Sequence, residues 1–387
     1  MSQKNVPPSV RLSPGALSAV RVGHPWVYRE GRSTMTPGTV VRLVDDHDRA
    51  AGWGLADEGD IAVRVLGRGE PPTDGLRAVL HERVRRADAF RWRIAPPETD
   101  CWRVVAGAGD GLPGLVVDRY GSLAVLRVYA LGWEPHLPRI VDAITSTGWA
   151  ETVYRRFGVR RVDDRRGGVT LWGQETPDAL VVSEHGMKLL VRPGTGQKTG
   201  LFLDQREHRL LVRRWAPGRR VANLFAYNGG FSVAAALGGA ATVITVDLSP
   251  DAVEDARENF RLNDLDPAGH EFQVRDVFQW TPEGTVDLLV VDPPALAHGK
   301  RSEATAARAY RKLHRRLGKV VGREGLLATS SCTAHLSLPR WREALREGLA
   351  DHGDWSWHWV STEPPDHPVA LAHEEGNYLK FALLRRR

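Results

Sequence analysis

Little cysteine and no long apolar run characterise this sequence, and each shortage excludes a class of protein. Only two cysteines, Cys101 and Cys332, occur in 387 residues, which argues against a disulfide scaffold and predicts a cytoplasmic location. No run of about 18 apolar residues is present, so no membrane span is expected. The segment Met1–Val10 lacks a basic stretch followed by an apolar one, so we expect no signal peptide.

Two nucleotide-binding motifs are absent as well. No G-x-x-x-x-G-K-S/T loop is present to hold phosphates, and the G-x-G-x-x-G fingerprint of dinucleotide-binding folds is not matched. No internal repeat or low-complexity tract is evident. Phosphate-rich nucleotides are therefore poor candidates for a ligand, and no metal site is expected.

The composition is that of an ordinary globular protein with a modest positive charge. Hydrophobic residues make up 42% and charged residues 26% of the chain, and its length suffices for two or three domains of about 100–200 residues. The formal net charge is +6 and is carried mostly by arginine. This balance favours a polyanionic partner, but arginine richness also follows from genomic base bias, and both explanations stay open.

The N-terminal part is expected to be a small β-rich domain over residues 1–72. Val40–Val44 and Ile61–Leu66 are β-rich runs separated by turn signals. A connecting helix over Leu76–Trp92 follows, within a linker that spans residues 73–98, because its apolar residues recur at helical spacing.

Residues 99–172 are expected to form a small α+β domain. Three strand patterns precede one helix and a further strand, an order typical of such modules. The expected strands are Trp102–Val105, Leu115–Asp118, Leu123–Val128 and Thr152–Arg155, and the expected helix is Leu137–Thr147.

The pattern changes over residues 173–387, where strands alternate with helices. Such alternation predicts an α/β fold with a parallel sheet and helices on both faces. The expected strands are Val221–Phe225, Thr242–Val246, Glu271–Val274, Asp287–Val291 and Gly325–Thr329, and the expected helices are Phe231–Leu237, Pro250–Asn263, Ala304–Val321 and Leu338–Leu349.

A glycine pair lies between the first of these strands and its helix. Gly229 and Gly230 let the backbone turn tightly and approach a ligand, beside the free N–H groups of a helix start. By itself, a plain strand–helix turn explains the pair better than a binding site does.

Reactive residues follow the other strands. Asp247 comes 18 residues after Gly229, where such folds hold ribose hydroxyls, and Asp276, Asp292 and Cys332 end the next three strands. Each Asp alone is as well explained by an N-cap or turn. Their coincidence across five strand ends favours a site, since ligands of open α/β sheets bind there.

An adenosine cofactor without phosphates fits these strand ends best. Acidic side chains repel phosphate but accept hydrogen bonds from ribose hydroxyls and an adenine amino group. The sequence therefore predicts a methyltransferase that uses S-adenosylmethionine, with S-adenosylhomocysteine as the product.

Several short motifs are spread over nearly the whole chain. With these motifs the sequence resembles the RlmI-type large-subunit (23S) rRNA cytosine-C5 methyltransferases. The resemblance implies an N-terminal PUA domain that binds RNA, a central α+β domain and a C-terminal Rossmann-like class I methyltransferase domain. The motifs are His24-Pro-Trp-Val27, Gly109 to Gly121, Glu184-His-Gly-Met-Lys188, Lys198 to Arg206, the glycine pair, Asp292-Pro-Pro294, Ser331-Cys332, Asp366-His-Pro-Val369 and Glu375-Gly-Asn-Tyr-Leu-Lys380.

By the same resemblance, Thr199, Asp204 and Arg206 help to close the methionine end of the cofactor. A guanidinium suits a carboxylate, although a structural ion pair also explains Arg206. The full set expected at the cofactor is Thr199, Phe202, Asp204, Arg206, Asn223, Phe225, Tyr227, Asn228, Gly229, Asp247, Leu248, Asp276, Val277, Asp292 and Pro293.

Cys332 and Asp292 are the expected catalytic residues. Cytosine C5 is a weak nucleophile, and addition of a thiolate to C6 makes it enamine-like, so that it can attack a methyl group. Asp292 is expected at the base edge, either as an acid that donates to N3 or as a carboxylate that accepts from the exocyclic amine. A buried, inert cysteine is the alternative for Cys332. Pro294-Ala295 brings no second thiol, so the base for the C5 proton is open, and Cys101 is expected to pack in the central domain.

Two basic segments suit an RNA partner. Tyr154–Arg166 holds six arginines and two aromatic residues, which fits phosphate contact and base stacking as well as it fits a solvated face. Ala309–Arg316 is a second basic segment. We expect 23S rRNA or its precursor as the partner and no membrane, and a homodimer is one assembly that the sequence allows. Trp355, Trp357 and Trp359 are expected on a strand with one apolar face.

Two other functions remain as alternatives. A methyltransferase that acts on guanine N7 would need no thiol, because N7 is already nucleophilic, so Cys332 distinguishes the two. A non-catalytic RNA-binding ribosome-assembly factor would not need Asp247, Asp276, Asp292 and Cys332 together.

Overall fold

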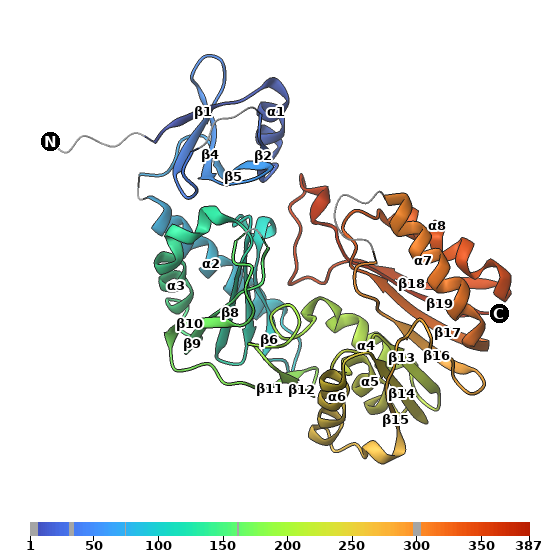
Figure 1. The fold of residues 1–387 in the computed structure, drawn as a ribbon. Coiled ribbons are helices and arrows are strands. Elements are labelled where there is room, and N and C mark those ends of the chain that lie inside the picture. The colour runs from blue at the N-terminus through green and yellow to red at the C-terminus, as the bar shows by residue number, and fades with distance from the viewer. Residues whose placement is uncertain (1–6, 31–34, 74, 161, 297–302) are drawn as a thin grey trace. The chain divides into compact units, whose positions relative to one another are not determined.

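The computed structural model describes residues 7–30, 35–73, 75–160, 162–296 and 303–387. The chain divides into two compact units (Figure 1). The first comprises Met1–Val182, Val191–Leu203 and Pro365–Gly376, and the second comprises Ser183–Leu190, Asp204–Pro364 and Asn377–Arg387. Within the described ranges, no helix is both long and apolar enough to cross a membrane.

A five-stranded sheet begins the first unit, in the order β1-β3-β4-β5-β2. Ser13 caps its helix by accepting a hydrogen bond from the Ala16 N–H, ahead of a proline in the first turn. The strands predicted at Val40–Val44 and Ile61–Leu66 are confirmed. The elements are β1 (Ser9–Arg11), α1 (Pro14–Val22), β2 (Trp26–Tyr28), β3 (Val40–Val44), β4 (Ala50–Ala56) and β5 (Ile61–Arg68).

A second five-stranded sheet, in the order β10-β9-β8-β7-β6, completes most of the first unit. Strand β8 pairs in parallel with β9, and the intervening helix makes the crossover that a parallel pair requires. The α+β pattern predicted here is confirmed. The elements are α2 (Gly75–Ile94), β6 (Cys101–Ala106), β7 (Leu115–Tyr120), β8 (Leu123–Val128), α3 (Leu137–Thr145), β9 (Thr152–Arg156) and β10 (Gly168–Gly173).

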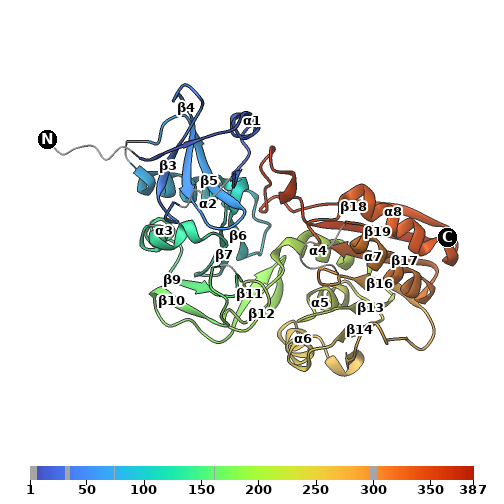
Figure 2. The same cartoon turned by 45° about the horizontal axis from the view of Figure 1, so that its top comes forward.

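The second unit is built on a seven-stranded sheet in the order β15-β14-β13-β16-β17-β19-β18. Helices α5 and α6 cover one face and α7 and α8 the other (Figures 1 and 2). The elements are α4 (Arg206–Trp215), β13 (Arg220–Leu224), α5 (Gly230–Leu237), β14 (Thr242–Asp247), α6 (Pro250–Leu262), β15 (Glu271–Val274), β16 (Val286–Val291), α7 (Glu303–Leu317), β17 (Val321–Ser331), α8 (Leu338–Leu349), β18 (Trp355–Ser361) and β19 (Lys380–Arg386).

Five parallel strands were expected, and the last two strands extend that sheet. Strand β19 runs antiparallel to both β17 and β18, so the C-terminal segment inserts between strands that precede it in the chain. Its first residue, Lys380, pairs with Ser331 at the end of β17. This strand was not expected from the sequence, because its pairing is long-range.

The tryptophan-rich strand corrects one expectation. Trp355 is half-buried on β18, but Trp357 is 37% and Trp359 53% exposed. The register shifts between Trp357 and Trp359, so strict alternation of inward and outward side chains is lost there. The strand is therefore present without the single apolar face.

Short elements connect the larger ones. Strands β11 (Leu180–Glu184) and β12 (Met187–Val191) pair with each other. The short 3-10 helices are η1 (Gly107–Asp110), η2 (Leu131–His136), η3 (Leu203–Gln205), η4 (Pro267–Gly269), η5 (Gly318–Val320), η6 (Ala350–His352) and η7 (Glu374–Gly376).

Candidate active site at the strand ends of the second unit

The strand order of the second unit reverses beside β13. Leu224 pairs with Val246 of β14 on one side and with Val291 of β16 on the other, so the three strands end at the same level. The residues that follow, Phe225, Asp247 and Asp292, therefore share one edge of the sheet. This edge is the topological switch point at which open α/β sheets bind ligands.

The turn after β13 is conformationally unusual. Phe225 and Tyr227 have φ values of 58° and 50°, and Gly229 has φ 75°. Positive φ is uncommon for bulky side chains and occurs often at functional sites. At Gly229 a side chain is also excluded by packing, since a Cβ there would lie 2.7 Å from the Cβ of Ala256.

Asp247 organises this turn through its carboxylate. One oxygen accepts the Tyr227 N–H at 2.8 Å and the other accepts the Ser249 N–H at 2.9 Å. A carboxylate oxygen has two lone pairs, so both oxygens keep capacity for a further donor. Asp247 can therefore accept hydrogen bonds from ribose hydroxyls while it holds the turn.

Exposed apolar side chains flank the acidic strand ends. Leu248 is 69% and Phe278 53% exposed, and the Phe278 ring lies edge-on to Phe225 with 5.8 Å between centroids. Asp276 accepts the Phe278 N–H at 2.9 Å through one oxygen. Apolar faces beside a half-buried carboxylate are the surroundings that a planar base with an amino group requires. The residues present therefore fit an adenosine.

The remaining residues predicted around the turn are mostly buried. The Asn223 side chain donates to the Ser232 hydroxyl at 2.9 Å, and the Asn228 side chain donates to the carbonyl of Leu190 at 3.2 Å. Val277 is also buried, as is Pro293. The two asparagines thus brace the turn, and any contact of these residues with a cofactor stays a prediction.

Asp204 and Arg206 lie at the start of α4 in the second unit and are both buried. Asp204 accepts the Tyr378 hydroxyl at 2.6 Å. Arg206 is ion-paired with Glu207, with 3.2 Å between Nε and Oε1. The role of Arg206 in binding a cofactor carboxylate stays a prediction.

Thr199 and Phe202 belong to the first unit. The buried Thr199 hydroxyl donates to Asp118 at 2.6 Å and lies 2.9 Å from the Tyr120 hydroxyl. The Phe202 ring lies 4.5 Å from the Lys198 ammonium. Their contribution to cofactor binding stays a prediction.

Asp292 stands at the end of a chain of hydrogen bonds. Gln205 donates to its carboxylate at 3.0 Å, and the Ser330 hydroxyl donates to the same oxygen. Gln205 is bonded in turn to His208, which reaches the Ser361 hydroxyl at 2.9 Å. Burial lowers the pKa of His208 to about 3, so this imidazole is neutral at pH 7. Gln205 and Ser330 thus fix the orientation of the Asp292 carboxyl group.

Gln205 and Ser330 were not named as site residues from the sequence. Gln205 lies within the motif Lys198 to Arg206, and Ser330 lies beside Ser331-Cys332 at the end of a predicted strand. These positions were the available signals, and neither specifies a hydrogen bond to Asp292.

Cys332 follows β17 directly and is half-buried, whereas Cys101 is fully buried in β6 of the first unit. The buried Tyr310 of α7 lies beside it, with its hydroxyl 3.4 Å from the hydroxyl of Thr333. Burial raises the pKa of Tyr310, and the charges of Cys332 and Asp292 raise it further. The structure thus brings Cys332 and Asp292 to one strand-end cluster with a neutral tyrosine.

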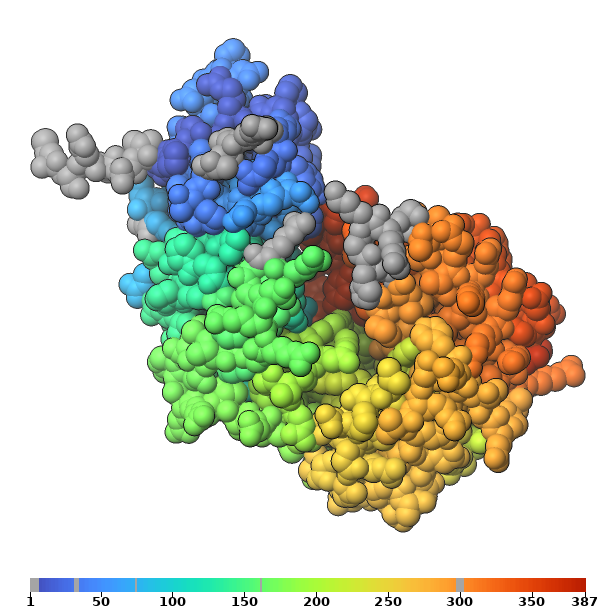
Figure 3. Space-filling model, viewed as in Figure 1, coloured from blue at the N-terminus to red at the C-terminus, as the bar shows by residue number. Residues whose placement is uncertain are grey.

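The basic segments are less available than their sequences indicate. In Tyr154–Arg166, Arg155 is buried and ion-paired with Asp163 and Glu134, and Arg156 donates to main-chain carbonyls. Exposed arginines remain at 160, 165 and 166, and Arg161 lies outside the described residues. In the second segment, three of the four basic side chains bond within the second unit. In Figure 3 the orange part of the chain, to which α7 belongs, lies on the visible surface of that unit.

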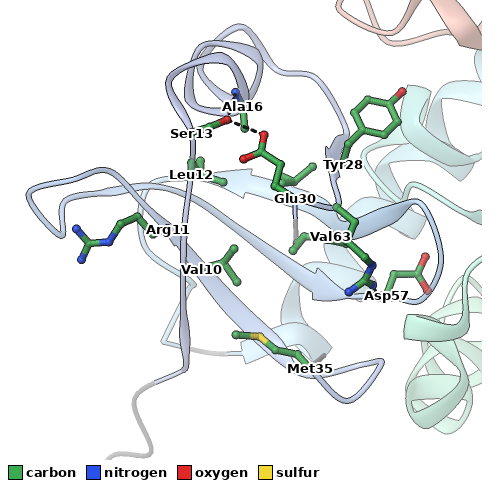
Figure 4. A pocket seen from close by; sticks show the side chains of 13 residues that line it. Val10, Arg11, Leu12, Ser13, Ala16, Tyr28, Glu30, Met35, Asp57 and Val63 are labelled. Atoms are coloured by element: carbon green, nitrogen blue, oxygen red, sulfur yellow. Dashed lines mark hydrogen bonds between the residues drawn. The ribbon is translucent and has the colours of Figure 1, made fainter. Parts of the chain in front are cut away.

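A cavity in the first unit is lined by none of the predicted site residues. It lies under the N-terminal sheet, where Val10, Leu12 and Val63 line it and Ser13 donates to Glu30 (Figure 4). Its volume of about 80 Å³ is well below the roughly 300–1,000 Å³ of ligand pockets. Among the described residues, no group of three or more His, Cys, Asp or Glu side chains is placed to hold a metal ion.

Comparison with known proteins agrees with this geometry. Residues 136–360 match the S-adenosylmethionine-dependent methyltransferase family, and residues 10–68 match the PUA-like domain. The chain is 36% identical to a ribosomal RNA large subunit methyltransferase of Deinococcus radiodurans, over 97% of both chains. It is 34% identical to ribosomal RNA large subunit methyltransferase I of Cronobacter sakazakii, over 96% of this chain and 98% of the relative.

Solved structures share the fold. A methyltransferase structure in complex with SAH matches with a TM-score of 0.86 and 24% identity, over 98% of this chain and all of that one. A Streptococcus mutans chain described as SAM-dependent matches with a TM-score of 0.85 and 23% identity, over 98% and 100%. The predicted class I methyltransferase fold with an N-terminal PUA-like domain is confirmed, whereas the predicted domain boundaries stay predictions.

Proposed function

Because this chain belongs to the S-adenosylmethionine-dependent methyltransferase family, we propose that it methylates C5 of a cytosine in large-subunit ribosomal RNA through a covalent bond between Cys332 and C6. The observation that carries the proposal is the cluster at the strand ends. A half-buried thiol follows β17, and Asp292 follows the neighbouring β16 and accepts the hydroxyl of Ser330. A thiol at this position can activate a weakly nucleophilic carbon, such as C5 of cytosine, by adding to the neighbouring C6.

The residues of this edge have separate tasks in the proposed reaction. When bound, S-adenosylmethionine supplies a methyl group that is electrophilic because it is attached to a sulfonium sulfur. Asp247 accepts from the ribose, Asp276 accepts from the adenine amine, and the turn at Gly229 lets the backbone approach the ligand. These residues bind and orient the cofactor, so the activation of the cytosine depends on Cys332 and Asp292.

Cys332 and Asp292 act on the cytosine. The Cys332 thiolate adds to C6, which makes C5 electron-rich. Asp292, which accepts hydrogen bonds from Gln205 and Ser330, also accepts one from the exocyclic amine of cytosine. It thereby selects cytosine over uracil, which presents a carbonyl at that position. Once C5 is methylated and its proton is lost, the bond between Cys332 and C6 breaks and the thiolate returns.

The RNA partner follows from the relatives and from the N-terminal domain. Two relatives are named as ribosomal RNA large subunit methyltransferases. The N-terminal domain is PUA-like, and the family resemblance implies that this domain contacts RNA. Exposed arginines at 160, 165 and 166 provide cations for phosphate contact.

The test is nucleoside mass spectrometry of large-subunit RNA treated with the purified protein and S-adenosylmethionine. We expect 5-methylcytidine with the wild type and with Cys101→Ala, and none with Cys332→Ala. RNA that carries 5-fluorocytidine should trap a covalent complex through Cys332, because C5 then holds no proton to lose. Full methylation by Cys332→Ala, or 7-methylguanosine as the product, would overturn the proposal. Failure to bind S-adenosylmethionine would overturn any enzymatic function.

A further inference from the structure

Lys380 is a buried cation beside the candidate nucleophile. It is the first residue of β19, is 2% exposed, and pairs across the antiparallel ladder with Ser331, the residue before Cys332. Lysine is almost never fully buried unless its charge has a partner. Its position at the reactive end of β17 therefore calls for an explanation.

The hydrogen bonds of Lys380 fix its ammonium near the Cys332 backbone. Nζ donates to the carbonyl of Thr333 at 2.8 Å and to the carbonyl of Tyr378 at 3.1 Å. Ser331 precedes Cys332 and Thr333 follows it. Lys380 therefore contacts the residues on both sides of Cys332, because it pairs with Ser331 in the ladder and donates a hydrogen bond to Thr333. Two carbonyls leave one of the three N–H groups of the ammonium for another acceptor.

The Lys380 ammonium stays charged at pH 7 although burial disfavours its charge. Burial lowers the pKa of Lys380 to about 8, while the charges of Glu363, Cys332 and Glu303 act to raise it. At pH 7 the side chain is therefore still protonated. Neutral donors would satisfy two carbonyls without this desolvation, so the charge itself is the feature to be explained.

Charged and titratable groups reach Cys332 from three directions. Asp292 at the end of β16 is the acidic group, and Tyr310 of α7 is neutral because burial raises its pKa. Lys380 of β19 is the cation of this set. Two other carboxylates act on Lys380 through their charge. Glu363 accepts the Leu379 N–H at 2.7 Å, and Glu303 accepts the Ser337 hydroxyl at 2.6 Å.

We propose that Lys380 is a positioning residue for the methyl transfer, whose buried ammonium holds Cys332 as a thiolate ready to add to the base. This inference rests on the proposed function, because it assigns a role around the same thiol. The thiol proton leaves to solvent, the sulfur electron pair forms the bond to C6, and elimination later returns the pair to sulfur. Lys380 keeps its proton throughout.

The pH window follows from the two groups. A neighbouring cation lowers the pKa of a thiol from its ordinary value of about 8.5. The ammonium is present below about pH 8 and is lost as the pH rises through that value. Activation by Lys380 is therefore confined to the range between the lowered thiol pKa and about 8.

The test measures the thiol itself. Purified full-length protein is alkylated with iodoacetamide from about pH 5.5 to 9.5, and the rate at Cys332 is read by peptide mass spectrometry. Cys101, which is 0% exposed, reports unfolding in the same digest. We expect a wild-type midpoint clearly below about 8.5, a midpoint at least about one pH unit higher in Lys380→Met, and a nearly wild-type midpoint in Lys380→Arg. For a wild-type midpoint above pH 7, that shift corresponds to roughly tenfold slower alkylation of Lys380→Met at pH 7.

Two results would overturn the inference. One is a wild-type midpoint at or above about 8.5, which decides the question even if Lys380→Met does not fold. The other is an equal midpoint in wild type and a folded Lys380→Met. If Cys332→Ala abolishes methylation and either result is found, the proposed function stands and only the role of Lys380 fails. If Cys332→Ala still methylates cytosine, the proposed function fails whatever the midpoints are.

Discussion

Replacement of Gly229 by alanine tests the turn at the proposed cofactor site. Its φ of 75° costs an L-residue roughly 1–2 kcal/mol. An added Cβ would also lie 2.7 Å from the Cβ of Ala256, and overpacking of a well-packed site costs about 1–3 kcal/mol. The variant should therefore lose about 2–5 kcal/mol of stability in the second unit.

Two other glycines of the second unit separate these causes. Gly218 has φ 69° with nothing within 4 Å of an added Cβ, and Gly269 has open space and no positive φ. We expect Gly218→Ala to lose about 1–2 kcal/mol and Gly269→Ala to change by less than about 0.5 kcal/mol. Gly229→Ala thus combines the unfavourable φ with overpacking, Gly218→Ala has the unfavourable φ alone, and Gly269→Ala has neither.

The assay is urea unfolding of the full-length protein, followed by circular dichroism with and without S-adenosylmethionine. The transition that the cofactor shifts to higher urea identifies the second unit, because a ligand stabilises the state it binds. Gly229→Ala should also weaken cofactor binding, by about tenfold for each 1.4 kcal/mol of interaction lost as the turn moves. The reasoning fails if Gly229→Ala is no less stable than Gly218→Ala, or if it binds the cofactor with wild-type affinity.

Two further predictions concern charge. Asp247→Asn should raise the Kd for S-adenosylmethionine about 10–100-fold by calorimetry, because hydrogen bonds to a charged group contribute about 1.5–3 kcal/mol, and unchanged affinity would exclude Asp247 as the ribose acceptor. Burial lowers the pKa of His314 from 6.5 to about 4, so the unfolded chain binds the proton more readily and stability falls as the pH drops from 6.5 towards 4. Urea unfolding should show a loss of about 2 kcal/mol from this group between pH 7 and pH 5, and His314→Gln should lack that part; an equal loss in both would contradict the assignment.

Local patterns determined most of the secondary structure. The strand Glu271–Val274 and the helix Leu338–Leu349 have the predicted bounds, and Pro250–Leu262 differs by one residue at its end. These elements were predictable because apolar periodicity, caps and turn residues act over a few neighbouring positions. The strand-end positions of Asp247, Asp276, Asp292 and Cys332 followed from the same local signals.

Long-range pairing decided what the local patterns could not. Strand β19 reaches its place only by inserting beside β17, and no local signal in Lys380–Arg386 specifies that neighbour. The tract Tyr154–Arg166 shows the same limit, because Glu134, one of the two carboxylates paired with Arg155, lies outside it.

The sequence by itself therefore determined the fold class, the edge of the sheet that carries the site and the thiol on it. Only the tertiary structure decided that Gln205 and Ser330 hold Asp292 and that Lys380 lies buried beside Cys332. The physical reason is that residue type and spacing set which backbone forms locally. The charge state of a side chain depends instead on desolvation and on neighbours that fold in from distant parts of the chain.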